Sequence, residues 1–239
     1  DDGDPATSEG IFVFTSSAPP STVKLNRLVD VTGVVHEFVP SADPVQRPVT
    51  EITAPTVFLV STGVALPAPV VLTAANTLPD GGLEQLERFE GMRVQVDSIT
   101  VTGPTLGGVN EQNATGSSNG VFYGVITGVA RPFREPGIEI PNPLPDGAPL
   151  TVPRFDGNPE RLQVDANGQL GATGFDVAAG DVVTGIVGPL DYSFRTYLIL
   201  PDPSAPPVVF HNTIPKGVKN PGPIQFTVGA ANLERFFDT

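Results

Sequence analysis

The sequence predicts an all-β protein made of two small barrel-like units, with one short helix and connectors rich in proline and glycine. Three observations predict this fold class. The 239 residues include 26 glycines and 27 prolines but only 16% charged residues, a composition typical of many short strands joined by turns. Segments that alternate between apolar and polar residues recur along the chain. Hydrophobic residues make up 39% of the sequence, which is too large a share for a disordered chain.

The first unit is expected over residues 1–103 and consists mainly of strands. Gly33 lies inside one of these strands, and a glycine in such a position is typical of a bulge that bends a small sheet. Leu83, Leu86 and Phe89 have helical spacing and predict one short helix, which turns at Gly91 into the last strand. Several strands with one helix before the last describe a small closed barrel of the OB type. The predicted strands are 10–17, 27–39, 56–63, 68–75 and the segment that ends at 103.

A second β unit is expected over residues 120–201, after a linker at 104–119 rich in glycine, asparagine and serine. A proline-rich connector at 202–223 then leads to a C-terminal strand at 224–239. The segments 31–35 and 183–187 read VTGVV and VTGIV. This echo agrees with two related OB-like units, although a chain rich in these residues also produces such matches by chance. The predicted strands of this unit are 120–133, 161–166, 181–194 and 195–201.

Charge and motifs narrow the classes of function. The formal net charge is −13 and no run of basic residues occurs, which argues against direct nucleic-acid binding. The chain has no cysteine and no apolar run long enough to span a membrane. The motifs of common hydrolases, zinc enzymes and nucleotide-binding proteins do not occur. We therefore expect a secreted, extracellular protein without a membrane partner.

The acidic start of the chain is the best candidate for a metal site. Asp2 and Asp4 stand close to glycine, and carboxylate oxygens on a flexible loop are the ligands that Ca²⁺ prefers. A solvated run of charges is the simpler interpretation of the same residues. His36 and His211 are the only histidines and belong to different units, so neither is expected to be catalytic.

An aromatic cluster is the best candidate for a ligand-binding site. Tyr192, Phe194 and Tyr197 flank Arg195, and on an OB barrel aromatic rings beside an arginine can stack the bases of a single strand. Packing in the barrel wall explains the same residues, and the acidic net charge favours that alternative.

Four segments resemble a known family. They read SEGIFVFTSSAPP (8–20), LERFEGMRV (86–94), GVFYGVITGVARPFREPGIEIP (120–141) and VVTGIVGPLDYSFRTYLILPDP (182–203). Together they resemble the region before the catalytic domain in secreted bacterial nucleases of the endonuclease/exonuclease/phosphatase superfamily. That resemblance implies an OB-like module, truncated here at its start, followed by a connector and a nuclease domain that uses Mg²⁺ or Ca²⁺.

The last residues, FTVGAANLERFFDT (226–239), resemble the first strand of that nuclease domain. The resemblance makes Asn232 the active-site asparagine. The family's metal-binding Glu, general-base Asp and catalytic His follow later in its domain and have no counterpart here. We therefore expect this chain alone to be inactive and to need no cofactor, with the missing downstream nuclease domain as its partner.

Three functions remain open at this point. The first is a non-catalytic accessory region that positions or docks a metal-dependent nuclease domain. The second is a structural subunit of an extracellular β-rich assembly, which uses its C-terminal strand to pair with another chain. The third is an OB-type module that binds a ligand through the aromatic cluster.

Overall fold

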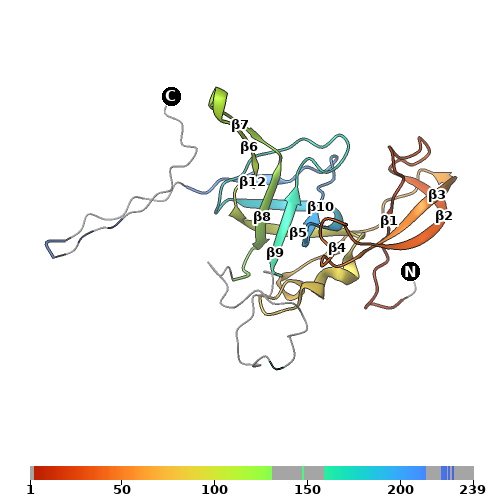
Figure 1. Cartoon of the computed structure of the whole chain (residues 1–239), viewed down its shortest axis with the longest axis horizontal. Coiled ribbons are helices and arrows are strands. Elements are labelled where there is room, and N and C mark those ends of the chain that lie inside the picture. Colours follow the sequence, from red (N-terminus) through yellow and green to blue (C-terminus); the bar gives the residue numbers. More distant parts are fainter. Residues whose placement is uncertain are drawn as a thin grey trace.

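A computed structural model describes residues 3–130, 147, 159–213, 222–224, 226 and 228. Strands dominate these residues, and their helical elements are short 3₁₀ helices, so the all-β class is confirmed (Figure 1). The helices are η1 (Ala74–Asn76), η2 (Leu83–Phe89) and η3 (Glu111–Asn113). The strands are β1 (Phe12–Val13), β2 (Arg27–Phe38), β3 (Val49–Thr62), β4 (Val70–Val71), β5 (Arg93–Gly103), β6 (Gly107–Asn110), β7 (Thr115–Ser118), β8 (Val121–Ile126), β9 (Arg161–Asp165), β10 (Val182–Ser193), β11 (Thr196–Ile199) and β12 (Val208–Phe210).

Five strands close into a barrel. Their order around it is β5, β8, β9, β11 and β10, and β10 pairs back with β5. All these pairings are antiparallel except that of β9 with β11, which is parallel. Numbered within the barrel, the order is 1-2-3-5-4-1, which is the strand order of the OB fold. β4 and β12 extend this sheet alongside β5 and β10.

The barrel wall bends where Gly185 of β10 faces Asp97 of β5. Apolar side chains alternate inward along both strands, and at this point the alternation of each strand slips by one residue. Gly185 has a φ of +69°, a conformation that residues with a Cβ rarely adopt. The slip keeps the apolar side chains inside as the strands curve. The inward residues of the two strands include Val94, Val96, Ile99, Val101, Val183, Ile186 and Leu190.

A second, three-stranded sheet precedes the barrel in the chain. Its order is β1, β3 and β2, and it lies at one end of the molecule, red to orange in Figure 1. β2 and β3 form a long antiparallel hairpin whose register shifts between Thr32 and Val34. A bulge is therefore present at this point as predicted, but its extra residue lies in β3, where Ala54 and Pro55 together oppose Gly33. A Cβ at Gly33 would lie 2.4 Å from Cγ2 of Ile52, so the close approach of the two strands also requires glycine.

In place of two barrels, the described residues form one closed barrel and this open sheet. The strand expected to end the first unit, β5, pairs with β8 and β10 and belongs to the barrel. The reason is that β5 has one continuous apolar face that fits β10, whereas β2 and β3 carry apolar residues on both faces. Residues 104–119, expected to be a linker, contain the hairpin of β6 and β7. The proline-rich segment 134–160 lies almost entirely outside the described residues.

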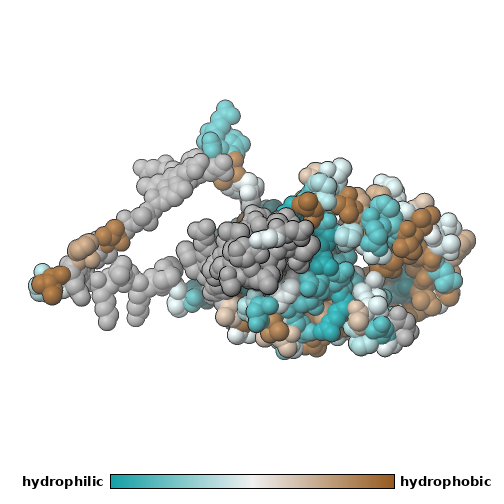
Figure 2. Space-filling model, turned by 60° about the horizontal axis from the view of Figure 1, so that its bottom comes forward, coloured by the Kyte–Doolittle hydropathy of each residue, from teal (hydrophilic) through white to brown (hydrophobic). Residues whose placement is uncertain are grey.

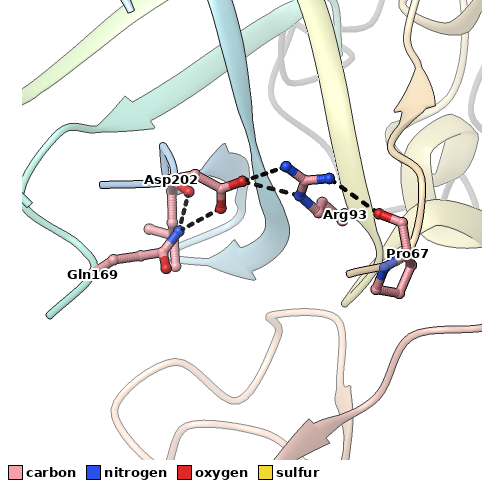
Figure 3. A network of polar contacts seen from close by, with 5 residues as sticks. Pro67, Arg93, Gln169 and Asp202 are labelled. Carbon is pink, nitrogen blue, oxygen red and sulfur yellow. Dashed lines mark hydrogen bonds and ion pairs between the residues drawn. The ribbon is translucent and has the colours of Figure 1, made fainter. Parts of the chain in front are cut away.

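A polar network fixes the barrel to the chain that enters and leaves it (Figure 3). Nε and Nη2 of Arg93 donate to Oδ2 of Asp202 at 2.9 and 2.8 Å, and Nη1 donates to the carbonyl of Pro67 at 3.0 Å. Nε2 of Gln169 donates to the carbonyl of Leu200 at 2.6 Å and to Oδ1 of Asp202 at 3.3 Å. Because Asp202 is nearly buried, these bonds hold the start of β5 against the end of β11.

Candidate functional surface

The structure places two of the predicted aromatic residues in the barrel core. Tyr192 and Tyr197 face each other across the β10–β11 hairpin, with ring centroids 4.8 Å apart. Both side chains are buried, and burial raises the pKa of each phenol above its usual value. A base cannot stack on rings that already pack inside the barrel, so the wall-packing alternative holds for these two residues.

The other two members of the cluster form the tip of the same hairpin. Phe194 and Arg195 have φ values of +51° and +61°, which are the left-handed conformations of a type I′ turn. The Phe194 side chain is 86% exposed. Nε and Nη2 of Arg195 donate to the two carboxylate oxygens of Asp43 at 2.6 and 2.5 Å. The hydrogen bond from Arg195 holds the pKa of Asp43 below its usual value. Arg195 therefore anchors the β2–β3 loop and does not form a stacking platform.

A cluster of carboxyl groups lies where the β2–β3 loop meets η2. Arg47 of the loop pairs with Glu87 and, at 3.3 Å, with Oε2 of Glu84. Behind it, the pKa of Glu90 is raised to about 7, first by burial and then by the negative charges of Asp191 and Glu87, while Arg47 partly offsets them. The pKa of Asp191 is also raised, mainly by burial. Glu90 therefore changes its charge near neutral pH at the junction between the sheet and the barrel.

Each histidine pairs with a buried carboxylate. Nδ1 of His36 lies 3.2 Å from Oε1 of Glu51, and Nδ1 of His211 lies 2.9 Å from Oδ2 of Asp181. Asp181 also accepts hydrogen bonds from backbone N–H groups, first among them that of Ala178, and these lower its pKa. The two pairs lie on different sheets, so they do not combine into one site.

Of the predicted metal and catalytic residues, Asp4 alone belongs to the part of the chain that the structure describes. Asp4 is exposed, and its Oδ1 accepts a hydrogen bond from the N–H of Ala6 at 2.9 Å. Asp2 and Asn232 lie outside the described residues. Among the residues that are described, no three His, Asp or Glu side chains gather as a metal site requires. These residues also include no helix that is long and apolar enough to cross a bilayer.

The most prominent surface feature is one that the sequence reasoning missed. Large apolar side chains are exposed over β1, β2 and β3, and they gather in brown at the end of the molecule that carries this sheet (Figure 2). Phe58, for example, is 63% exposed and Val35 is 65% exposed. The run TVFLV at 56–60 was a usable signal, because a strand without alternation needs cover on both faces. We call this set the apolar sheet surface; it consists of Phe12, Phe14, Leu28, Val34, Val35, Phe38, Phe58, Leu59 and Val60.

Comparison with known proteins gives one match. Residues 71–210 match the family described as a domain of unknown function, DUF8508. The matched region runs from β4 to β12 and so contains the barrel with its two flanking strands, whereas the apolar sheet surface precedes it. No curated protein and no solved structure matches the chain. Because the match spans more than half of the residues, the chain belongs to the DUF8508 family.

Proposed function

We propose that this chain is a non-catalytic interaction module, in which the barrel carries a three-stranded sheet that packs against another folded unit. The observation that supports this function is the apolar sheet surface. Exposed apolar side chains gathered on one sheet in this way mark protein interaction sites. Because these side chains are about half exposed, full burial of each contributes up to about 1.5 kcal/mol to association.

The strand pattern gives a second reason to expect a cover for this sheet. A sheet in a globular protein buries at least one face against another layer, and a lone hairpin has little stability in water. Here β2 and β3 are long, but every residue from Thr32 to Phe38 is exposed, as is every residue from Phe58 to Thr62. Such strands are suited to a partner that covers them.

The sheet is also held in a defined orientation, as docking requires. The bidentate pair of Asp43 with Arg195 and the pairs of Arg47 with η2 attach its loop to the barrel. At its other side, Gly10 approaches Gly91 so closely that a Cβ at Gly10 would lie 2.1 Å from a backbone atom. A surface fixed at two points loses little freedom on binding, which favours affinity.

The resemblance to secreted nucleases suggests what this docked unit is. It is a metal-dependent nuclease domain. The present chain is then an accessory region that adds no catalytic group of its own. We expect no hydrolysis of DNA by this chain with Mg²⁺ or Ca²⁺. Turnover above that of a metal-free control would contradict the non-catalytic assignment.

Hydroxyl-radical footprinting tests the docking function. The isolated chain in dilute solution is compared with the protein as recovered from its natural source, and oxidation is read by mass spectrometry at Leu28, Phe58 and Val60. Docking predicts at least several-fold protection of these three residues in the natural state. Leu170, which is fully exposed on the barrel, serves as the internal reference. Equal oxidation of the sheet in both samples would refute the proposed function.

A further inference from the structure

We propose that the partner of the sheet is a second copy of this chain, whose residues Ile224–Val228 add as a strand to the outer edge of β2. This inference rests on the proposed docking function and names the occupant of the sheet. The result is a head-to-tail contact between two different surfaces of the same chain.

The outer edge of β2 has backbone groups available for such a strand. Among the described residues β2 pairs only with β3, and it forms one edge of its sheet. From Val34 to Phe38 the register with β3 is regular. The carbonyl of Ile52 accepts a hydrogen bond from the N–H of Phe14, the residue that follows β1, so Ile52 bonds away from β2. In an antiparallel ladder its neighbour Val35 must then direct its N–H and C=O away from β3. Glu37, two residues on, does the same.

A row of apolar side chains ends at this edge. Val13, Ile52 and Val35 are register partners across β1, β3 and β2 and share one face of the sheet. Val35 is the outermost and the most exposed of the three. An apolar side chain on an added strand would extend this row and cover Val35, as cross-strand neighbours do elsewhere in sheets.

The segment Ile224–Val228 has the sequence expected of a strand that adds to the edge of β2. Its sequence is IQFTV, which alternates residues of high β propensity with polar ones. Ile224, Phe226 and Val228 are each at least 80% exposed, so these apolar side chains are uncovered. The segment carries no charge, and it can approach an acidic neighbour without adding to the repulsion that a net charge of −13 creates between copies.

The geometry favours a contact between copies over one within a single chain. In Figure 1 the described residues of this segment, in blue, lie at the opposite end of the molecule from β1, β2 and β3. The two complementary surfaces thus lie at opposite ends of the molecule. A contact between two different patches of one chain is heterologous, and repetition of it builds rings or open filaments.

Two variants block the two halves of the contact separately. Val35→Pro removes the outward N–H that the added strand needs and leaves the bonds between β2 and β3 intact, because proline is tolerated where the N–H faces solvent. Phe226→Asp places a charge in the apolar row. Val35→Ile and Gln225→Asp are the matched controls, since the first keeps the donor and the second changes the opposite side of the segment.

Sedimentation velocity over a concentration series gives the readout, with far-ultraviolet circular dichroism as the check on folding. We expect the wild type and both controls to form species larger than the 24.9 kDa monomer, and both blocking variants to remain monomers. An equimolar mixture of Val35→Pro and Phe226→Asp should recover a dimer, because each supplies the surface that the other lacks, and it should not grow further.

A wild type that stays monomeric at every concentration would overturn this inference, as would a mixture that recovers no dimer. If the wild type is monomeric while the sheet is protected in the natural protein, docking stands and the occupant is a different molecule. If neither association nor protection is found, the docking function fails as well. Should Val35→Pro fail to fold, Phe226→Asp alone still decides whether Ile224–Val228 is required.

Discussion

Glu90 at the junction of sheet and barrel gives the sharpest prediction about stability. We expect Glu90→Gln to stabilise the fold at pH 8 and to have little effect at pH 4.5. In the folded protein the pKa of Glu90 is raised from 4.5 to about 7, first by burial and then by the negative charges of Asp191, Glu87 and Glu37. The fold therefore disfavours the ionised carboxylate, and glutamine removes that charge while it keeps the shape.

The magnitude follows from the difference between the two pKa values. A difference of about 2.5 pKa units corresponds to roughly 3 kcal/mol at 1.36 kcal/mol per unit. Because Glu90 is only half buried, solvent screens part of this cost, and we expect a gain of about 1–2 kcal/mol. The sign is set by the raised pKa: the folded state binds the proton more tightly than the unfolded chain. The penalty is thus absent below pH 4.5, grows between pH 4.5 and 7, and is complete above pH 7.

Urea unfolding followed by circular dichroism at pH 8, 6 and 4.5 measures this effect. The quantity to compare is the difference in unfolding free energy between variant and wild type, since the contributions of the other carboxyl groups then cancel. Asp80→Asn, at an exposed carboxylate, is the control and should show no pH-dependent gain. A gain for Glu90→Gln that is equal at all three pH values, or absent at pH 8, would refute the electrostatic reasoning.

Substitutions at three further positions test the barrel. Asp202→Asn removes the charge that accepts two hydrogen bonds from Arg93, and we expect it to lower the unfolding free energy by about 2–3 kcal/mol. Gly185→Ala places a Cβ at a φ of +69° where no atom lies within 4 Å; it should cost about 1 kcal/mol from backbone strain alone, and Gly185→Asn should cost less. Phe194→Asn puts a residue that tolerates positive φ at the exposed turn and should raise the melting temperature, whereas an unchanged or lower value would show that the turn is not strained. Thermal and urea unfolding report all three.

Several features of the fold were predictable because they depend on local sequence. The alternation within 93–103 and 181–194 identified the two main barrel strands, and a bulge is present opposite Gly33. The pairing of these strands was not predictable in the same way. β5 and β10 are separated by about 80 residues, and alternation indicates which side of a strand is buried but not which strand will cover it. For this reason the prediction from sequence placed β5 in a separate first barrel.

The environments of the candidate site residues were likewise predictable only in part. Tyr192 lies two residues after the core residue Leu190, so the alternation of β10 places both side chains on the buried side of the strand. The same alternation would bury Phe194, but this residue is exposed because the chain has already entered the turn. The raised pKa of Glu90 could not be predicted, since it depends first on burial and then on carboxylates that come together only in the folded protein.

The distance in sequence between β5 and β10 also has a consequence for the order of folding. The β2–β3 hairpin joins neighbouring residues and can form quickly, whereas closure of the barrel requires a loop of about 80 residues to come together first. The apolar side chains of β2 and β3 are therefore exposed in the unfinished chain before the barrel that supports these strands is complete. During synthesis this interval is the period of greatest risk of aggregation, and a chaperone that shields extended apolar strands would increase the yield of folded protein.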